Sequence, residues 1–248
     1  MALRSQSLEA LILHTRESPS GGRFVSCLTR ELGLVDCFLF GGGRSKLRSM
    51  AVPWHRGTIL LYSAANNELT KITDFEPESL YAEIRKNYET IILATWASEL
   101  MLATHGLGGL GFPIMAEVLE SLDARADGAT SMLRVVKLVF AAKVLDAAGA
   151  LPELSGCAHC TGKSAQNALQ YYSPAKSGFV CEACREEGDE GLSVAALSWL
   201  YGNLDKPMAE IQSCAAREQE LAGLEACCME LLVRMTGKPI RTALLLGN

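Results

Sequence analysis

The sequence has no apolar run that approaches the roughly 18 residues needed for a membrane-spanning helix. Its longest apolar stretches, near Ile91 and Leu138, are interrupted by charged or polar residues. The first residues likewise lack an apolar stretch long enough for a secretory signal, because Glu9 interrupts them. These absences predict a cytoplasmic protein that does not enter a membrane.

The sequence also lacks the motifs that mark common catalytic sites. Neither the nucleophile elbow G-x-S-x-G nor the metalloprotease motif H-E-x-x-H is present. The histidines are few and scattered along the chain: His14, His55, His105 and His159. An enzyme would need a pocket of perturbed acids or histidines, which the sequence does not display. We therefore expect a protein that is not an enzyme.

Two glycine-rich stretches lack the context of a nucleotide-binding loop. Residues 106–111, GLGGLG, formally fit G-x-G-x-x-G, but the segment before them has helical periodicity and opens no βαβ unit. Asp123 lies too near to be the acidic residue of that fingerprint. Residues 41–46, GGGRSK, lack the spacing of a P-loop. The first stretch is predicted to be a flexible connector between helices.

The net charge of −5 argues against a protein covered by nucleic acid, but the charge is unevenly divided. Residues 1–73 contain nine Lys or Arg against five Asp or Glu, about +4, so the rest of the chain carries about −9. This asymmetry restricts any contact with a polyanion to the basic first part.

Up to about residue 77 the chain reads as short strands. The segments SLEALILHTR, RFVSCLTREL and LVDCFLFGGG mix branched and aromatic residues with polar ones, and glycine-rich turns separate them. Two further strands flank Asn66 and Asn67, whose side chains suit a tight turn. Five short strands without a convincing helix predict a small closed barrel, most simply of the OB type.

From Pro77 onward the periodicity is helical. Apolar residues recur at spacings of three and four in residues 77–105, and Pro113 suits the first turn of a second helix. Apolar residues encircle the segment 131–149, which is typical of the central helix of a bundle. We therefore expect an α+β protein, with an OB-fold β-barrel domain at residues 1–77 and a helical domain at residues 78–248.

Nine cysteines in a protein expected to be cytoplasmic indicate metal or redox chemistry rather than disulfides. Four of them form the pattern C-x2-C-x20-C-x2-C: Cys157, Cys160, Cys181 and Cys184. Because four thiolates complete a tetrahedron, the pattern predicts one structural Zn²⁺ in a module inserted at about residues 154–190. A redox dithiol pair, iron, or four thiols that bind nothing are the alternatives. Core packing is expected for the other five cysteines: Cys27, Cys37, Cys214, Cys227 and Cys228.

The basic first part contains a glycine-flanked stretch, GGGRSKLRSM, whose cations can follow a phosphate backbone without reading its sequence. With its neighbours it makes a predicted DNA-binding set of six residues: Arg23, Arg30, Arg44, Lys46, Arg48 and Arg56. Three aromatic residues could offer a stacking face: Phe24, Trp54 and Tyr62. The alternative is that these charges only keep one edge of the barrel soluble.

The order of these parts resembles the RecO family of bacterial DNA repair and recombination proteins. The match is carried by FAAKVLDAAGALPELSGCAHCTG at residues 140–162, by SGFVCEAC before the second cysteine pair, and by the ending GKPIRTALLL. The opening, from SLEALILHTRES to the basic loop GGGRSK, is similar as well. The resemblance covers essentially the whole chain, although the cysteine motif alone is specific.

The resemblance implies a mediator without nucleotide hydrolysis. It would bind single- and double-stranded DNA, anneal complementary strands and, with RecR, load RecA onto strands coated by single-strand-binding protein. It makes Arg44, Lys46 and Arg48 the DNA contacts, on a basic loop thinner than the family's usual one. The helical domain would bind the C-terminal tail of single-strand-binding protein; Arg134 and Lys137 are candidates, although they suit an anchor at the rim of the bundle equally well.

A zinc-stabilised protein–protein adaptor without direct DNA binding is the alternative function. In that hypothesis the barrel is only structural, and its cations do not contact phosphates. The overall acidity of the chain is unusual for a DNA-binding protein.

Overall fold

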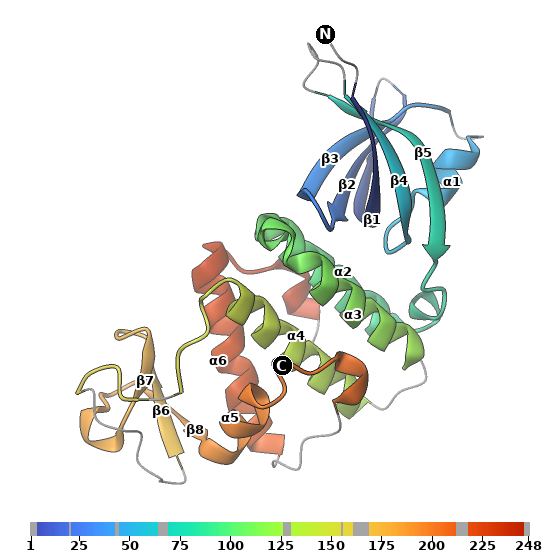
Figure 1. Ribbon diagram of the computed structural model, residues 1–248. Coiled ribbons are helices and arrows are strands. Elements are labelled where there is room, and N and C mark those ends of the chain that lie inside the picture. The colour runs from blue at the N-terminus through green and yellow to red at the C-terminus, as the bar shows by residue number, and fades with distance from the viewer. Residues whose placement is uncertain are drawn as a thin grey trace. The chain divides into compact units, whose positions relative to one another are not determined.

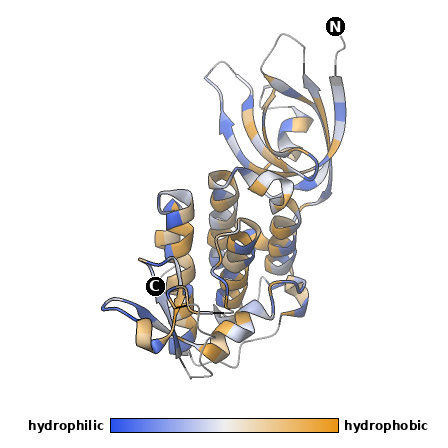
Figure 2. Ribbon diagram, turned by 60° about the vertical axis from the view of Figure 1, so that its left-hand side comes forward, coloured by the Kyte–Doolittle hydropathy of each residue, from blue (hydrophilic) through white to orange (hydrophobic). Residues whose placement is uncertain are grey.

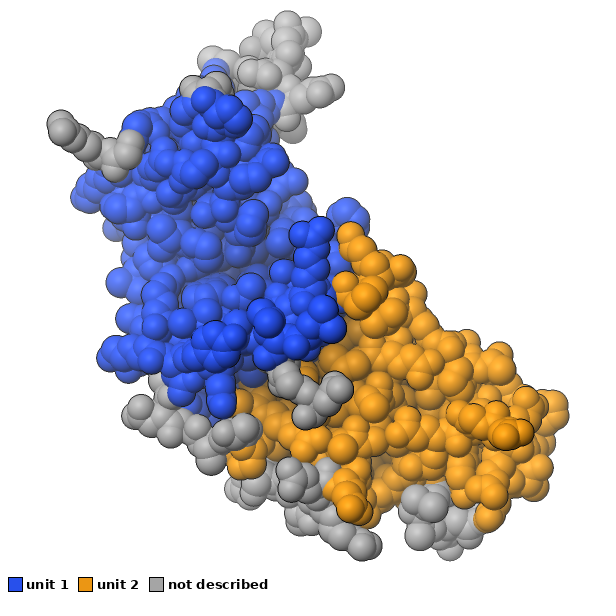
Figure 3. Space-filling model, turned by 180° about the vertical axis from the view of Figure 1, so that it is seen from behind, with its two compact units in different colours: residues 1–128, 240–248 blue, residues 129–239 orange. Residues whose placement is uncertain are grey.

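The computed structural model describes residues 4–19, 21–42, 45–63, 69–125, 130–154, 156–160, 169–211 and 218–245. The chain divides into two compact units, which Figure 3 shows in different colours. Unit 1 comprises residues 1–128 and 240–248, and unit 2 comprises residues 129–239. The expected boundary at residue 77 falls within the last strand of unit 1.

Unit 1 contains a closed five-stranded barrel with the order β1-β2-β3-β5-β4 (Figure 1). Its strands are β1 (Arg4–Glu17), β2 (Arg23–Thr29), β3 (Gly33–Leu39), β4 (Arg56–Ser63) and β5 (Thr70–Ser79). All pairs are antiparallel except β3 and β5, and β4 returns to β1 to close the barrel. The closed barrel confirms the predicted OB-like fold. A short helix between β3 and β4, α1 (Lys46–Met50), was not predicted.

The barrel core follows the two-residue period of its strands, which is visible as changing colour along them in Figure 2. Val25, Cys27, Cys37 and Leu39 alternate with outward residues and are buried in one apolar cluster. Leu47 and Met50 of α1 pack against the same cluster. The buried thiols of β2 and β3 confirm the prediction that they act as small apolar side chains.

Two helices of unit 1 follow the barrel, α2 (Tyr88–Ala103) and α3 (Gly111–Ala124). The side chain of Asn87 caps α2 by accepting a hydrogen bond from the backbone N–H of Glu89. The GLGGLG segment joins the two helices through a tight turn, η2 (His105–Gly109), as predicted for a connector. Residues 105–109 all have positive φ, which explains why three of them are glycine.

The η2 turn packs directly against the turn between β2 and β3. A Cβ atom on Gly106 would lie 2.5 Å from Cδ1 of Leu28 and 3.1 Å from the backbone nitrogen of Leu34. A Cβ atom on Gly33 would lie 3.1 Å from the nitrogen of Gly109. The glycines therefore allow two backbones to approach closely, which is a packing role and not a nucleotide-binding one.

Unit 2 is built on three helices, α4 (Thr130–Ala147), α5 (Val194–Tyr201) and α6 (Glu218–Thr236). Residues 135–145 of α4 are all buried, which confirms its prediction as a central helix. The sequence reading missed a three-stranded sheet of order β7-β6-β8, with β6 (Leu169–Ser173), β7 (Gly178–Val180) and β8 (Glu190–Ser193). The remaining short helices are η1 (Glu83–Lys86), η3 (Glu182–Cys184), η4 (Met208–Glu210) and η5 (Arg241–Leu245).

No helix in the described parts of the chain combines the length and apolar character needed to cross a bilayer.

Replacement of Gly106 by Ala should destabilise unit 1 more than the same change at Gly108. Both glycines have a left-handed backbone conformation, with φ of 67° and 63°, so each substitution costs about 1 kcal/mol in backbone strain. Only the Cβ on Gly106 meets neighbouring atoms, which raises its expected cost to about 3 kcal/mol. Urea denaturation followed by tryptophan fluorescence measures both. Equal losses of stability would show that the close approach contributes nothing.

Candidate metal centre and candidate nucleic-acid interface

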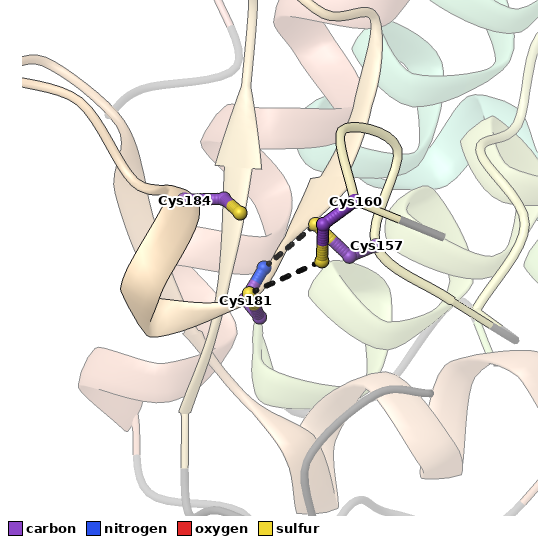
Figure 4. Close-up of side chains that lie close together, drawn as sticks. All are labelled: Cys157, Cys160, Cys181 and Cys184. Atoms are coloured by element: carbon purple, nitrogen blue, oxygen red, sulfur yellow. Dashed lines mark hydrogen bonds between the residues drawn. The ribbon is translucent and has the colours of Figure 1, made fainter. Parts of the chain in front are cut away.

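The four predicted metal ligands come together in unit 2. Figure 4 shows the side chains of Cys157, Cys160, Cys181 and Cys184 gathered around one point, and their four sulfur atoms all lie within 4.8 Å of one another. The Sγ atoms of Cys160 and Cys181 are 3.9 Å apart. Tetrahedral coordination with metal–sulfur bonds of about 2.3 Å separates neighbouring sulfurs by about 3.8 Å. The cluster therefore has the dimensions to hold one metal ion.

Backbone contacts explain why the two cysteine pairs meet. The hairpin of β6 and β7 returns the chain, so that Cys181 directly follows β7 beside the first pair. The N–H of Ala158 donates to the carbonyl oxygen of Phe179 at 2.7 Å and fastens the first pair to β7. A Cβ atom on Gly178 would lie 2.9 Å from the Cβ of Ala158, so this contact depends on glycine.

The backbone also favours the ionised form of one ligand. Burial opposes ionisation of the Cys157 thiol, but N–H groups of Cys160, Cys181 and His159 outweigh it and lower its pKa to about 6. The contact with the Cys181 thiol, and then burial, raise the pKa of Cys184. Four thiolates so close repel one another, and a bound cation removes that repulsion. The exposed His159 is not part of the ligand set.

A site with four thiolate ligands has no open position for water or substrate, so its role is structural. Cys157 packs in a small apolar cluster with Tyr171 and Val180, and Cys181 and Cys184 pack against it. A metal ion here would tie the β6–β7 hairpin to the two cysteine turns. An ion held by all four thiolates would therefore support the small sheet.

The predicted DNA-binding cations fall into two groups, both in unit 1. The first group lies around α1, where Arg23 and Arg48 both pair with Glu17. Arg23 also donates to the carbonyl oxygens of Arg48 and Ala51, at 3.3 and 3.4 Å. Arg48 donates to the carbonyl oxygen of Gly41 at 3.2 Å, which ties the helix to the loop after β3.

Two more members of the predicted set belong to the segment around α1. Lys46 is exposed and forms no ion pair with any residue that the structure describes. Arg44 lies outside the described residues. The segment that begins α1 thus presents at least one exposed cation beside the Arg48–Glu17 pair.

The second group, Arg30 and Arg56, links the barrel to α3. Both guanidinium groups pair with Glu9, at 2.9 and 2.6 Å, and Arg56 also pairs with Glu120 at 2.9 Å. Their guanidinium carbons lie 4.8 and 5.7 Å from the ring centre of Phe112. Burial opposes ionisation of Glu9, but hydrogen bonds from the two arginines outweigh it and lower its pKa. The structure therefore does not bring the five described cations of the predicted set together in one group.

The two candidates for binding a partner's tail have an internal partner. Arg134 and Lys137 on α4 pair with Glu225 on α6, at 2.8 and 2.5 Å. The Glu225 side chain is only 15% exposed, and that of Lys137 only 10%. The ion pairs fasten α6 to α4, which is the anchoring role that the sequence left open beside tail binding.

The predicted stacking residues differ in exposure. Trp54 is buried, and its indole N–H donates to the Ser98 hydroxyl at 3.1 Å, so its ring is not available to a ligand. Phe24 is 36% exposed on the outer face of β2. The sequence reading missed Phe40, which is 54% exposed just after β3. Phe38 and Phe40 are two residues apart, so both lie on the outer side of the strand, and this spacing could have identified Phe40.

Two family models together match nearly the whole chain. "Recombination protein O N terminal" matches residues 1–81, and "Recombination protein O C terminal" matches residues 85–242. The chain belongs to the RecO family. The first RecO model ends just after the barrel, and the second includes the four cysteines.

Relatives in several bacteria carry the name DNA repair protein RecO. The protein of Myxococcus xanthus (strain DK1622) is 26% identical over 191 residues, which are 75% of each chain. That of Dehalococcoides mccartyi (strain CBDB1) is 27% identical over 184 residues, 71% of this chain and 69% of the relative. That of Bacillus subtilis (strain 168) is 24% identical over 184 residues, 72% and 68% of the two chains.

Purified protein should contain about one metal ion per chain, held by the cysteine cluster. Replacement of Cys160 by Ser should remove most of it, because three thiolates bind the ion less well than four. Replacement of Cys227, a buried thiol of α6 outside the cluster, by Ala should leave the content unchanged. Elemental analysis measures all three proteins. Absence of metal from the wild type, or its retention in Cys160→Ser, would contradict the assignment.

Replacement of Arg56 by Ala should lower the stability of unit 1 by about 2 kcal/mol, because it removes pairs with Glu9 and Glu120 and the contact with Phe112. Replacement of the exposed Lys46 by Ala should change it by less than about 0.5 kcal/mol. Urea denaturation compares the two. Similar small effects would show that Arg56 does not hold α3 to the barrel.

Proposed function

We propose that this RecO-family protein is a non-enzymatic mediator of DNA repair and homologous recombination. It binds single- and double-stranded DNA and anneals complementary strands. With RecR it helps to load RecA onto strands coated by single-strand-binding protein. Membership of the family, together with an OB-like barrel that has cations around α1, is the observation that carries the proposal.

Residues 1–77 are the proposed DNA-binding domain, and the cations around α1 are its proposed phosphate contacts: Arg23, Arg44, Lys46 and Arg48. Glu17, the partner of Arg23 and Arg48, is 58% exposed. The side chains of Arg23 and Arg48 are only 16% and 18% exposed, so a phosphate would reach them from the side of the exposed carboxylate and take the place of Glu17. Arg30 and Arg56 are poorer candidates, because a phosphate would have to displace Glu9 from its two arginines.

Zinc is the proposed metal of the cysteine cluster. Four thiolates in a tetrahedral, closed arrangement suit Zn²⁺ best, with iron as the alternative. The ion would be structural and would stabilise the helical domain proposed for residues 78–248. That domain is the proposed site for the tail of single-strand-binding protein, and binding through Arg134 and Lys137 would require the tail to displace Glu225.

A zinc-stabilised adaptor without direct DNA binding is the second candidate. The observation in its favour is that carboxylates neutralise four of the six predicted DNA contacts: Arg23, Arg30, Arg48 and Arg56. In this case the barrel would serve as a scaffold for protein partners. A measurement of DNA binding against salt separates the two candidates.

The affinity for a single-stranded oligonucleotide should fall with salt with a log–log slope near −2, as expected for about three neutralised phosphates. Combined replacement of Arg44, Lys46 and Arg48 by Ala should flatten the slope, because it removes three of the proposed phosphate contacts, and should not unfold the protein. A control that removes three exposed cations elsewhere, Lys206, Lys238 and Arg241, should keep the wild-type slope. Fluorescence anisotropy across a salt series gives all three slopes. Binding that is absent or indifferent to salt would support the adaptor.

A further inference from the structure

A row of four side chains crosses the outer face of the barrel on four adjacent strands. Strand register pairs Arg16 with Phe24, Phe24 with Phe38, and Phe38 with Lys71. The sequence neighbours of these residues, such as Val25 and Cys37, point into the core, so the row itself points outward. Aromatic rings therefore occupy the middle of the row, and a cation lies at each end.

Phe38 is the buried floor of this row, and its two neighbours are exposed. The rings of Phe24 and Phe40 pack edge-on against Phe38, with ring centres 5.0 and 4.6 Å away. Phe38 is only 4% exposed, but Phe24 is 36% and Phe40 54% exposed. Two large aromatic side chains are thus held in fixed positions with part of each ring open to solvent, which is characteristic of a binding surface.

A hollow adjoins the rings of Phe38 and Phe40. Its volume is about 500 Å³, and its lining consists of the two rings and glycine backbone: Phe38, Phe40, Gly21, Gly22, Gly41 and Gly42. A Cβ atom on Gly22 would lie 2.7 Å from the ring of Phe38, so this wall has to be glycine. Glycine walls beside an exposed ring leave room for a flat group to lie against the ring.

The two cations of this face differ from Arg23, Arg30, Arg48 and Arg56, which are all paired with carboxylates. The Arg16 guanidinium lies 5.1 Å from the ring centre of Phe24, and the Lys71 ammonium lies 4.8 Å from that of Phe40. Neither pairs with a carboxylate of the residues that the structure describes, whereas Arg23 and Arg48 share Glu17. A ligand for this face should therefore combine flat apolar groups with negative charges along a chain.

We infer that this face, defined by Arg16, Phe24, Phe38, Phe40 and Lys71, is a stacking site for unpaired bases of single-stranded DNA. One base lies against Phe40 in the hollow and another against Phe24, while Arg16 and Lys71 contact the neighbouring phosphates. Base stacking on aromatic side chains is tolerant of sequence, because every base has a π-face. The inference rests on the proposed DNA binding and adds that the barrel prefers unpaired strands, since the bases of a duplex are stacked on one another.

The face also connects with the proposed phosphate contacts around α1. Gly41 lines the hollow, and its carbonyl oxygen accepts a hydrogen bond from Arg48. A strand with one base in the hollow therefore has a neighbouring phosphate within reach of Arg48. Stacking and charge contacts can thus act on the same strand.

The test compares two labelled strands of equal length and charge, an oligothymidylate and the same strand with abasic sites at its centre. The wild type should bind the oligothymidylate about tenfold more tightly, since stacking of one or two bases is lost on the abasic strand. Combined replacement of Phe24 and Phe40 by Ala should bring this ratio close to 1 and leave the salt slope unchanged. The control Tyr88→Ala removes a 67% exposed aromatic residue of α2 and should keep the ratio.

The outcomes separate this inference from the proposed function. Equal, salt-dependent affinity of the wild type for both strands would overturn the stacking site and leave DNA binding intact. Failure to bind either strand would overturn both. A ratio that survives in the Phe24→Ala, Phe40→Ala variant would place the base contacts elsewhere and overturn the assignment to this face.

A second readout covers the case in which the double alanine variant does not fold. The single variant Phe40→Leu keeps apolar volume at an exposed position and removes only the ring, so it should fold and still lower the ratio. Photocrosslinking of the wild type to a strand containing 5-iodouracil should give adducts on Phe24 or Phe40, identified by mass spectrometry. Adducts found only in residues 129–239 would contradict the inference.

Discussion

Closure of the five-stranded barrel is the constraint on which the rest of unit 1 depends. β1 pairs with β4 along its first half and with β2 along its second, and an irregularity between Ile12 and His14 lets one strand serve both neighbours. Once the barrel is closed, strand register decides which side chains enter the core and which form rows on the outside. Strand register therefore determines both the aromatic row and the place where α1 packs against the barrel.

Two carboxylates, Glu9 and Glu17, divide the paired arginines of the barrel into two groups. Glu9 engages Arg30 and Arg56, and with Phe112 they form the contact between barrel and α3. Glu17 engages Arg23 and Arg48 and is the more exposed of the two carboxylates, so it is the partner that the proposed function has a phosphate replace. In a chain of net charge −5, the location of unpaired and weakly paired cations is more informative about DNA contact than the total charge.

Much of this arrangement could be predicted from the sequence, because it depends on local patterns. Alternation of apolar residues predicted the barrel, and the spacing of Cys157, Cys160, Cys181 and Cys184 predicted their cluster. The ion pairs could not be predicted, since Arg56 and its partner Glu9 are 47 positions apart and meet only through barrel closure. The β6–β7–β8 sheet was missed because its strands have only three to five residues, too few for a periodicity to show.

Amide chemical shifts of isotopically labelled protein, recorded while a short single-stranded oligonucleotide is added, test the central claim most directly. The account predicts shifts at the end of β1, the start of β2, the end of β3 through Gly42, and α1. Amides of the cysteine cluster in unit 2 should not shift, because its role is structural. Shifts confined to residues 129–239, or no shifts at all, would contradict the account.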